Sequence, residues 1–161
     1  MIELEMQWAI EPQAIPTFEQ AQQWGQAALL PENQPSDWQV TLRIVDPNEI
    51  QTLNRTYRQK DRPTNVLSFP FEQPVGLAEP VPYLGDLVVC AEVVSQEAHS
   101  QQKSLTAHWA HMVVHGMLHL QGLVHMTEAE AEQMETLEID ILSQLGFENP
   151  YLLKGASIPH E

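Results

Sequence analysis

Three histidines, His115, His119 and His125, follow one another at intervals of four and six residues, and Gly122 lies between the second and the third. On a helix, residues four apart share a face, so the first two imidazoles could reach one ion. A glycine after the last helical turn favours a left-handed turn that could bring the third imidazole back. Three neutral imidazoles with one open position are typical of a catalytic zinc site. We therefore predict one zinc ion per chain, held by these side chains.

The chemistry expected of such an ion is hydrolysis. Zinc lowers the pKa of a bound water to about 7, so a hydroxide nucleophile is available at neutral pH. The same histidine spacing occurs in metzincin proteases, which place a glutamate general base directly after the first histidine. Here that position is Gly116, which argues against peptide hydrolysis. Phosphodiester cleavage depends mainly on stabilising charge in the transition state, a task for which an arginine is well suited. Nickel, cobalt or copper could replace zinc on ligand type alone.

His108 and His111 extend the histidine stripe toward the start of the same helix. Neither has the geometry of a third ligand, so we expect a role supporting the metal ligands or a position at the surface. The general acid is unassigned, with Asp86 and His111 as candidates. Ordinary structural roles are expected for the remaining histidines and the single cysteine: His99, His160 and Cys90.

The basic residues are few and unevenly placed. The net charge is −15, from 22 acidic and 7 basic residues, which by itself argues against nucleic-acid binding. Four of the seven basic residues nevertheless fall between positions 55 and 62: Arg55, Arg58, Lys60 and Arg62. From the residues alone, this segment fits an anion site and a solvated helix end equally well.

The pattern of apolar residues predicts an α+β fold in one domain, residues 1–161. Alternation or short apolar runs predict strands at 2–10, 38–45, 65–71 and 84–91, and Pro70 suggests a sheet edge or a strand end. Helical periodicity and capping residues predict helices at 17–30, 46–57, 91–101, 104–121 and 128–145. We expect a small mixed four-stranded sheet with about five helices packed on it. The apolar helix 104–121 is expected at the centre, carrying two of the zinc-ligand histidines.

Composition also limits the location of the protein. The single cysteine excludes an internal disulfide, which suits a reducing compartment. The start of the chain has acidic residues where a signal peptide would have basic ones, and no apolar run of about 18 residues is present. We predict a cytoplasmic protein that does not associate with membranes.

Several blocks of the chain resemble the YbeY family of bacterial rRNA-maturation endoribonucleases. The hallmark H-G-x-L-H-L-x-G-Y-D-H of that family corresponds to H-G-M-L-H-L-Q-G-L-V-H at 115–125. Further family signatures occur within 53–70, at 84–88 and in the last helix, at 132–146. Two departures stand out: Leu123-Val124 replaces the Tyr-Asp pair of the family, and Asn65 stands where many members have aspartate. The first 35 residues carry little that can be matched.

The resemblance implies a zinc-dependent, single-strand-specific endoribonuclease. Members of the family trim the 3′ end of small-subunit ribosomal RNA and act in ribosome quality control, so the implied partners are single-stranded RNA and the ribosomal small subunit. The essential arginine of the family maps onto Arg58, the expected catalytic residue. Arg55, Lys60 and Arg62 are expected to hold flanking phosphates. Two alternatives stay open, a zinc metallopeptidase-like hydrolase and a non-catalytic ribosome-assembly factor with a structural zinc. The sequence does not define the oligomeric state.

Overall fold

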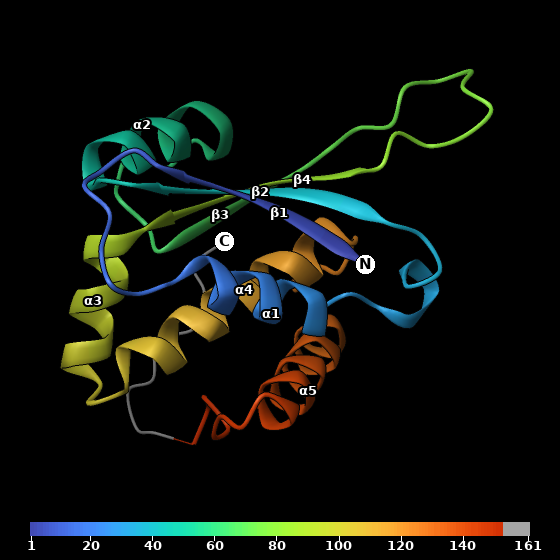
Figure 1. The fold of residues 1–161 in the computed structure, drawn as a ribbon. Helices are drawn as coiled ribbons and strands as arrows, with labels where there is room; N and C mark the ends of the chain where they lie inside the picture. The colour runs from blue at the N-terminus through green and yellow to red at the C-terminus, as the bar shows by residue number, and fades with distance from the viewer. Residues whose placement is uncertain (153–161) are drawn as a thin grey trace.

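The computed structural model describes residues 1–152, which form one sheet with helices on both faces (Figure 1). The strands are β1 (Ile2–Trp8), β2 (Trp38–Val45), β3 (Val66–Pro70) and β4 (Tyr83–Cys90). The α-helices are α1 (Phe18–Ala27), α2 (Pro47–Arg58), α3 (Ala91–Ser100), α4 (Leu105–Leu120) and α5 (Glu128–Gln144). The predicted α+β class is confirmed.

The order of the strands in the sheet is β1-β2-β4-β3. Strands β1, β2 and β4 are parallel, whereas β3 runs antiparallel to β4, so the sheet is mixed as predicted. Strand β3 lies at an edge of the sheet, in agreement with the position of Pro70, because proline has no backbone N–H to donate to a neighbouring strand.

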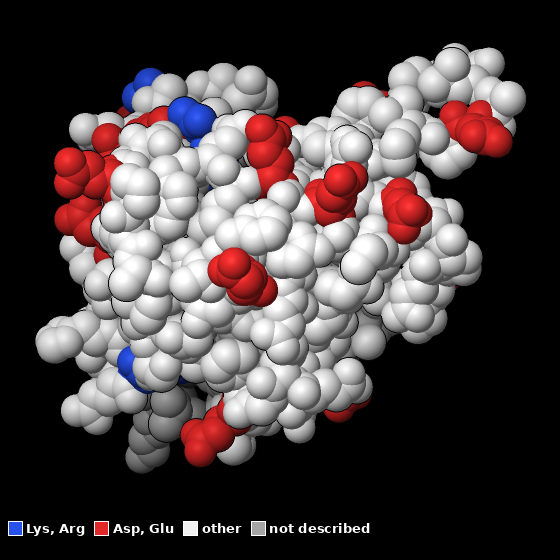
Figure 2. Space-filling model, viewed as in Figure 1, with Lys and Arg blue, Asp and Glu red and all other residues white. Residues whose placement is uncertain are grey.

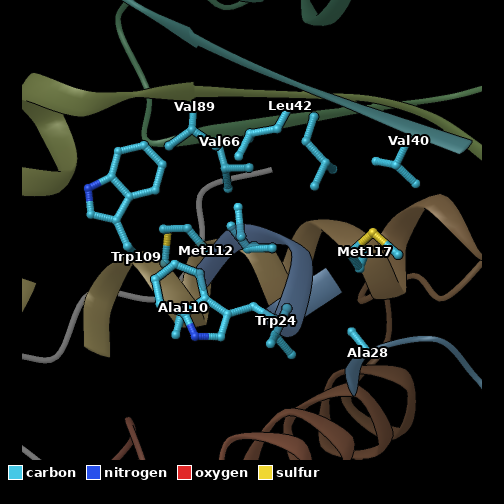
Figure 3. Close-up of a cluster of buried hydrophobic side chains, with 14 of the residues drawn as sticks. Trp24, Ala28, Val40, Leu42, Val66, Val89, Trp109, Ala110, Met112 and Met117 are labelled. Atoms are coloured by element: carbon cyan, nitrogen blue, oxygen red, sulfur yellow. The ribbon is translucent and has the colours of Figure 1, made fainter. Parts of the chain in front are cut away.

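Helix α4 lies at the centre of the layer on one face of the sheet, with α1 and α5 beside it (Figure 1). Twelve of its sixteen residues are buried, in agreement with its apolar sequence. Figure 3 shows its apolar side chains packed between the sheet and α1; the residues labelled there include Trp24, Leu42, Val66, Val89, Trp109 and Met112. The predicted central position of the histidine helix is therefore confirmed.

Helix α2 covers part of the opposite face, which we call the outer face (Figure 1). Ile50 of α2 packs in a small, separate apolar cluster with Leu67, Val88 and Cys90. Cys90 is fully buried, in agreement with its expected packing role. Among residues 1–152, no helix is both long enough and apolar enough to cross a membrane.

All of the predicted element boundaries but one lie within two residues of those observed. The helix predicted at 17–30 ends at Ala27, since Pro31 disfavours helical backbone at the residue before it, and a short 3₁₀ turn, Pro31–Asn33, follows. The strand predicted at 2–10 ends at Trp8, which pairs with Ile44, and the Ala9 N–H still donates to the Ile44 carbonyl at 2.8 Å.

Candidate active site

The three predicted ligands gather at the C-terminal end of α4. His115 and His119 lie one turn apart on the helix. Gly122, with a φ of +97°, ends the helix, and the Leu123 N–H bonds to the Leu118 carbonyl at 3.2 Å, which is the hydrogen bond of a Schellman motif. This turn returns the chain toward the helix. The ring centroids are separated by 5.9 Å for His115 and His119, 5.4 Å for His115 and His125, and 5.7 Å for His119 and His125.

These distances can be compared with those of a zinc site. Zn–N bonds of about 2.0–2.1 Å at tetrahedral angles place imidazole centroids roughly 5 Å apart. The observed separations of 5.4–5.9 Å exceed that value by a small margin. As it stands, no group of three His, Cys, Asp or Glu side chains within residues 1–152 is close enough to hold an ion. The donor types and the spacing of the rings nevertheless fit zinc, since the three centroid separations are close to those of a tetrahedral site.

At Gly116, the residue after the first predicted ligand, helix α4 lies close to the sheet. A Cβ atom at this position would lie 2.7 Å from the Leu87 Cδ2 atom and 3.3 Å from the Ser68 Oγ atom. A glutamate side chain at position 116 would therefore enter the core between helix and sheet and displace Leu87. The general base that metzincin proteases carry at this position has no room here.

A buried carboxylate that sequence reasoning did not select, Glu138 on α5, links two histidines of α4. Its Oε2 atom lies 3.0 Å from the His115 Nδ1 atom, and its Oε1 atom lies 2.5 Å from the His111 Nε2 atom. The Tyr151 hydroxyl donates to the same Oε1 atom at 2.6 Å. The sequence signal was the position of Glu138 on the buried stripe of an amphipathic helix, beside Met134 and Leu142.

The hydrogen bonds determine the charge of this group. Burial alone would raise the pKa of Glu138, but hydrogen bonds from His111 and His115 outweigh burial and lower the pKa to about 2. Burial lowers the pKa of His111 more than the Glu138 carboxylate raises it. The Tyr151 hydroxyl has a raised pKa because of its burial and the nearby carboxylate. At neutral pH the cluster therefore contains an ionised Glu138 carboxylate beside a neutral His111 and a neutral Tyr151.

His108 and His111 are both 1% exposed, so the expectation that they could lie at the surface is wrong. The His108 Nε2 atom lies 2.9 Å from a carboxylate oxygen of Glu97, which also accepts from the Asn65 amide at 3.2 Å. Two buried imidazole–carboxylate pairs therefore line the helix before the predicted ligands. The supporting role beside the ligands fits His111, which shares Glu138 with His115. His99 is exposed, and His160 lies outside the described residues.

Arg58, the last residue of α2, reaches from the outer face to the edge strand. Its guanidinium donates to the Ser68 carbonyl at 2.8 Å and lies over the Phe69 ring, 5.0 Å from its centroid. On the other side of β3, the Ser68 hydroxyl donates to the Gly116 carbonyl of α4 at 3.4 Å. Ser68 thus connects the predicted catalytic arginine to the residue after the first predicted ligand.

The other predicted substrate-binding residues, Arg55, Lys60 and Arg62, are exposed. Arg55 makes a long contact of 3.4 Å with the Asp61 carboxylate. The buried Asn54 holds the loop after α2 through two hydrogen bonds. Its main-chain carbonyl accepts from the Lys60 N–H at 3.2 Å, and its side-chain amide donates to the Arg62 carbonyl at 2.9 Å. In Figure 2, basic side chains lie at the upper left, over α2, with acidic side chains beside them and across the rest of that face, and a further basic patch lies at the lower left.

Asp86, a candidate general acid, lies on the outer face, away from α4. It is opposite Phe69 in the sheet, and the Tyr83 hydroxyl hydrogen-bonds to it. Its neighbour Leu87 is the residue that contacts α4. Asp86 lines an outer cavity of about 660 Å³ together with Arg43. The sheet therefore separates this carboxylate from the three histidines.

Comparisons with known proteins show the family and the fold of the chain. The sequence profile of the family described as "Endoribonuclease YbeY" matches residues 6–146, so the match begins well before position 35. A protein of Hydrogenovibrio crunogenus named Endoribonuclease YbeY is 54% identical over 157 residues, which cover 94% of this chain and 98% of that protein. The solution structure of TM1509 from Thermotoga maritima has the same fold, with a TM-score of 0.56 at 22% identity over 91% of this chain and 92% of that one. On these grounds the chain belongs to the YbeY family.

Proposed function

We propose that this protein is a zinc-dependent endoribonuclease that cleaves single-stranded RNA. The observation that carries the proposal is that strand β3 contacts both the histidine helix and Arg58. Three imidazole rings lie within 5.9 Å of one another at the end of α4, and Arg58 is held on the strand that packs against the same helix. The name of the 54% identical relative, Endoribonuclease YbeY, supports the reaction class.

His115, His119 and His125 would hold the ion. When bound, zinc activates water as a nucleophile and neutralises charge on a phosphoryl group. His115 is buried, whereas His119 and His125 are half-buried, so an ion that they hold would lie near the surface, where a polymer could reach it. A structural zinc site is normally closed by a fourth protein ligand, so the three-histidine set favours catalysis over the alternative of a non-catalytic assembly factor.

Arg58 would bind the scissile phosphate and stabilise the negative charge that develops on it. Its contacts with the Ser68 carbonyl and the Phe69 ring use only part of the guanidinium, which has five N–H donors in a planar fork. Because the arginine is held at the strand edge before substrate arrives, little reorganisation is needed during the reaction. Arg55, Lys60 and Arg62 would bind neighbouring phosphates as exposed charges.

The packing around Gly116 disfavours the metallopeptidase alternative. Peptide hydrolysis in the enzymes with this histidine spacing uses a glutamate at that position, and here a Cβ atom alone would come within 2.7 Å of Leu87. Phosphodiester cleavage has less need of that group. The remaining parts of the proposal, a cytoplasmic location and action on the 3′ end of small-subunit ribosomal RNA, draw their support from family membership.

The proposal is tested by metal analysis and RNA cleavage on the same preparation. We expect about one zinc per chain and cleavage of an unstructured RNA oligonucleotide but not of its duplex. Chelation should abolish cleavage, and added zinc should restore it. Cleavage that persists without metal would exclude the zinc-dependent reaction, and casein hydrolysis without RNA cleavage would favour the peptidase alternative. Equal cleavage of duplex RNA would remove the single-strand specificity.

A further inference from the structure

We propose that Glu138 is a positioning residue for the metal: it fixes His115 in the form that can bind zinc through Nε2 and offsets the charge of the ion from inside the core. This inference rests on the metal site proposed above. Glu138 comes from α5, a helix that supplies none of the predicted ligands, and it is 1% exposed.

The first argument is the pattern of donors and acceptors. An ionised carboxylate only accepts hydrogen bonds, so the His115 Nδ1 atom, 3.0 Å from Oε2, must carry the proton of that ring. The Nε2 atom of His115 is then the lone-pair nitrogen, which is the one that a metal requires. The same reasoning puts a proton on the Nε2 atom of His111, 2.5 Å from Oε1. Carboxylates that orient metal-binding histidines in this way raise the basicity of the ligand.

The second argument is the charge of the core. A carboxylate removed from water is costly unless a positive charge is close to it. Within residues 1–152, the only ion-pair partners of Glu138 are His111 and His115, and no lysine or arginine pairs with it. Its third donor, the Tyr151 hydroxyl, is neutral. A divalent ion held by His115 would add a positive charge next to this buried carboxylate.

The third argument is the rigidity of the support. Glu138 lies one turn after the buried Met134 and one turn before the buried Leu142 on α5. Its two carboxylate oxygens are occupied by groups from α4 and from the segment after α5. The carboxylate cannot rotate without breaking these contacts, so the His115 ring is held in one orientation before any ion binds.

The test is Glu138→Gln, measured by zinc affinity in competition with a chelator. Glutamine keeps the shape but has one acceptor oxygen and one NH₂ group. Whichever way the amide faces, one of the two histidines meets a donor, and the negative charge is lost. We expect zinc affinity to fall by about 10–100-fold. The melting temperature of the metal-free protein should fall, because the lowered pKa of Glu138 means that the folded state favours the carboxylate form. The matched control below separates this loss of stability from a loss of metal affinity. An unchanged zinc affinity would overturn the proposal, as would a lower melting temperature without a change in affinity, which indicates a packing role only.

Glu97→Gln is the matched control. Glu97 makes the equivalent contact with His108 on the same helix, 2.9 Å from its Nε2 atom, but His108 is not a predicted ligand. We expect this variant to bind zinc like the unaltered protein. Tyr151→Phe removes a donor to Glu138 without touching His115 and should change the affinity by less than the tenfold lower limit expected for Glu138→Gln. A loss of affinity in Glu97→Gln as large as that in Glu138→Gln would overturn the assignment, since it would reflect a general loss of buried charge.

A second measurement covers the case in which Glu138→Gln does not fold. In the metal-free, unaltered protein, ¹⁵N NMR of the imidazoles should place the His115 proton on Nδ1. A proton on Nε2 would overturn the inference. The two proposals also fail differently. If the unaltered protein takes up no zinc, the metal site itself is wrong; if it takes up zinc and Glu138→Gln does so equally well, only the role of Glu138 is wrong.

Discussion

The histidine helix α4 and the basic segment 55–62 contribute to one predicted site but are held by different forces. Helix α4 is buried, and three of its four histidines lie within hydrogen-bond distance of a carboxylate: His108, His111 and His115. The cations of the segment are exposed, except for Arg58, which is partly buried against β3. Interactions in the core do not depend on salt, whereas exposed charges are screened beyond about 10 Å in 0.1 M salt. Metal binding should therefore depend on packing in the core, and RNA binding should depend on ionic strength.

The largest effect is expected from His119→Ala. The variant loses one of three ligands, so both zinc content and RNA cleavage should fall together, the latter by roughly a thousandfold or more, since a catalytic ion contributes several kcal/mol to the transition state. Metal content and a cleavage assay on unstructured RNA check this. The exposed His99 gives the control His99→Ala, which should retain both. Retained cleavage in a metal-free His119→Ala sample would show that RNA cleavage does not need an ion held by these histidines.

Arg58→Ala should have the next largest effect and should separate the two regions. Loss of a donor that stabilises transition-state charge typically lowers the rate by about 10²–10³-fold. Zinc content should stay near that of the unaltered protein, because Arg58 contacts β3 and no predicted ligand. Arg58→Lys keeps the charge but not the planar fork, and should recover only part of the rate. Full activity of Arg58→Ala would remove this residue from the reaction.

Gly116→Ala tests the packing of the histidine helix. Its Cβ atom would lie 2.7 Å from the Leu87 Cδ2 atom, so we expect a loss of stability of about 1–3 kcal/mol. Gly25→Ala is a matched control in helix α1, where the nearest side-chain atom would be at 3.8 Å. There, the better helix propensity of alanine should stabilise by up to about 1 kcal/mol. Chemical denaturation measures both changes, and equal behaviour of the two variants would contradict the close approach at Gly116.

A smaller effect, dependent on salt, is expected from neutralising the exposed cations. For single-stranded nucleic acid, each phosphate contact contributes about −0.7 to the slope of log K against log salt concentration. Changing Arg55, Lys60 and Arg62 together to glutamine should therefore flatten the slope by up to about 2. Zinc content should not change. Arg43→Gln alters a cation that pairs with Glu49 on the outer face, and should leave the slope as it was.

The smallest effect concerns Tyr83 on the outer face and appears only in alkali. Burial, helped by the hydrogen bond to Asp86, raises the pKa of Tyr83 to about 12. An unfolded tyrosine has a pKa of about 10. Because the folded value is higher, this contribution to stability is complete below pH 10 and is lost as the pH rises toward about 12. Melting temperatures across this range should fall less steeply in Tyr83→Phe, whereas the exposed Tyr57→Phe should follow the unaltered protein.

The sequence was most informative where local rules decide the structure. The alternation at 38–45 predicts β2 to the residue, and Asp46 with Pro47 predicts the start of α2, since both signals depend only on neighbouring residues. The turn at Gly122 was predicted for the same reason. The strand order β1-β2-β4-β3 was not predicted, because pairing between distant strands leaves no local pattern.

The candidate site shows the same limit. The histidine spacing predicted three neighbouring rings, because two of them share one helix face. Glu138 was missed as a site residue, since a single carboxylate on α5 carries no sign of which helix it will meet. The carboxylate partners of His108 and His111 also come from other helices, which is why a surface position for these histidines could not be excluded beforehand.

Asn54 gives the basic segment a property of its own. This one buried residue sets the path of the backbone at Lys60 and Arg62, through its main-chain carbonyl and its side-chain amide. Exposed cations on that loop can be exchanged during evolution at little cost to folding, because none of them holds the backbone. Replacement of the amide would release the whole turn at once. The geometry of the segment is thus inherited through a residue that no substrate needs to touch.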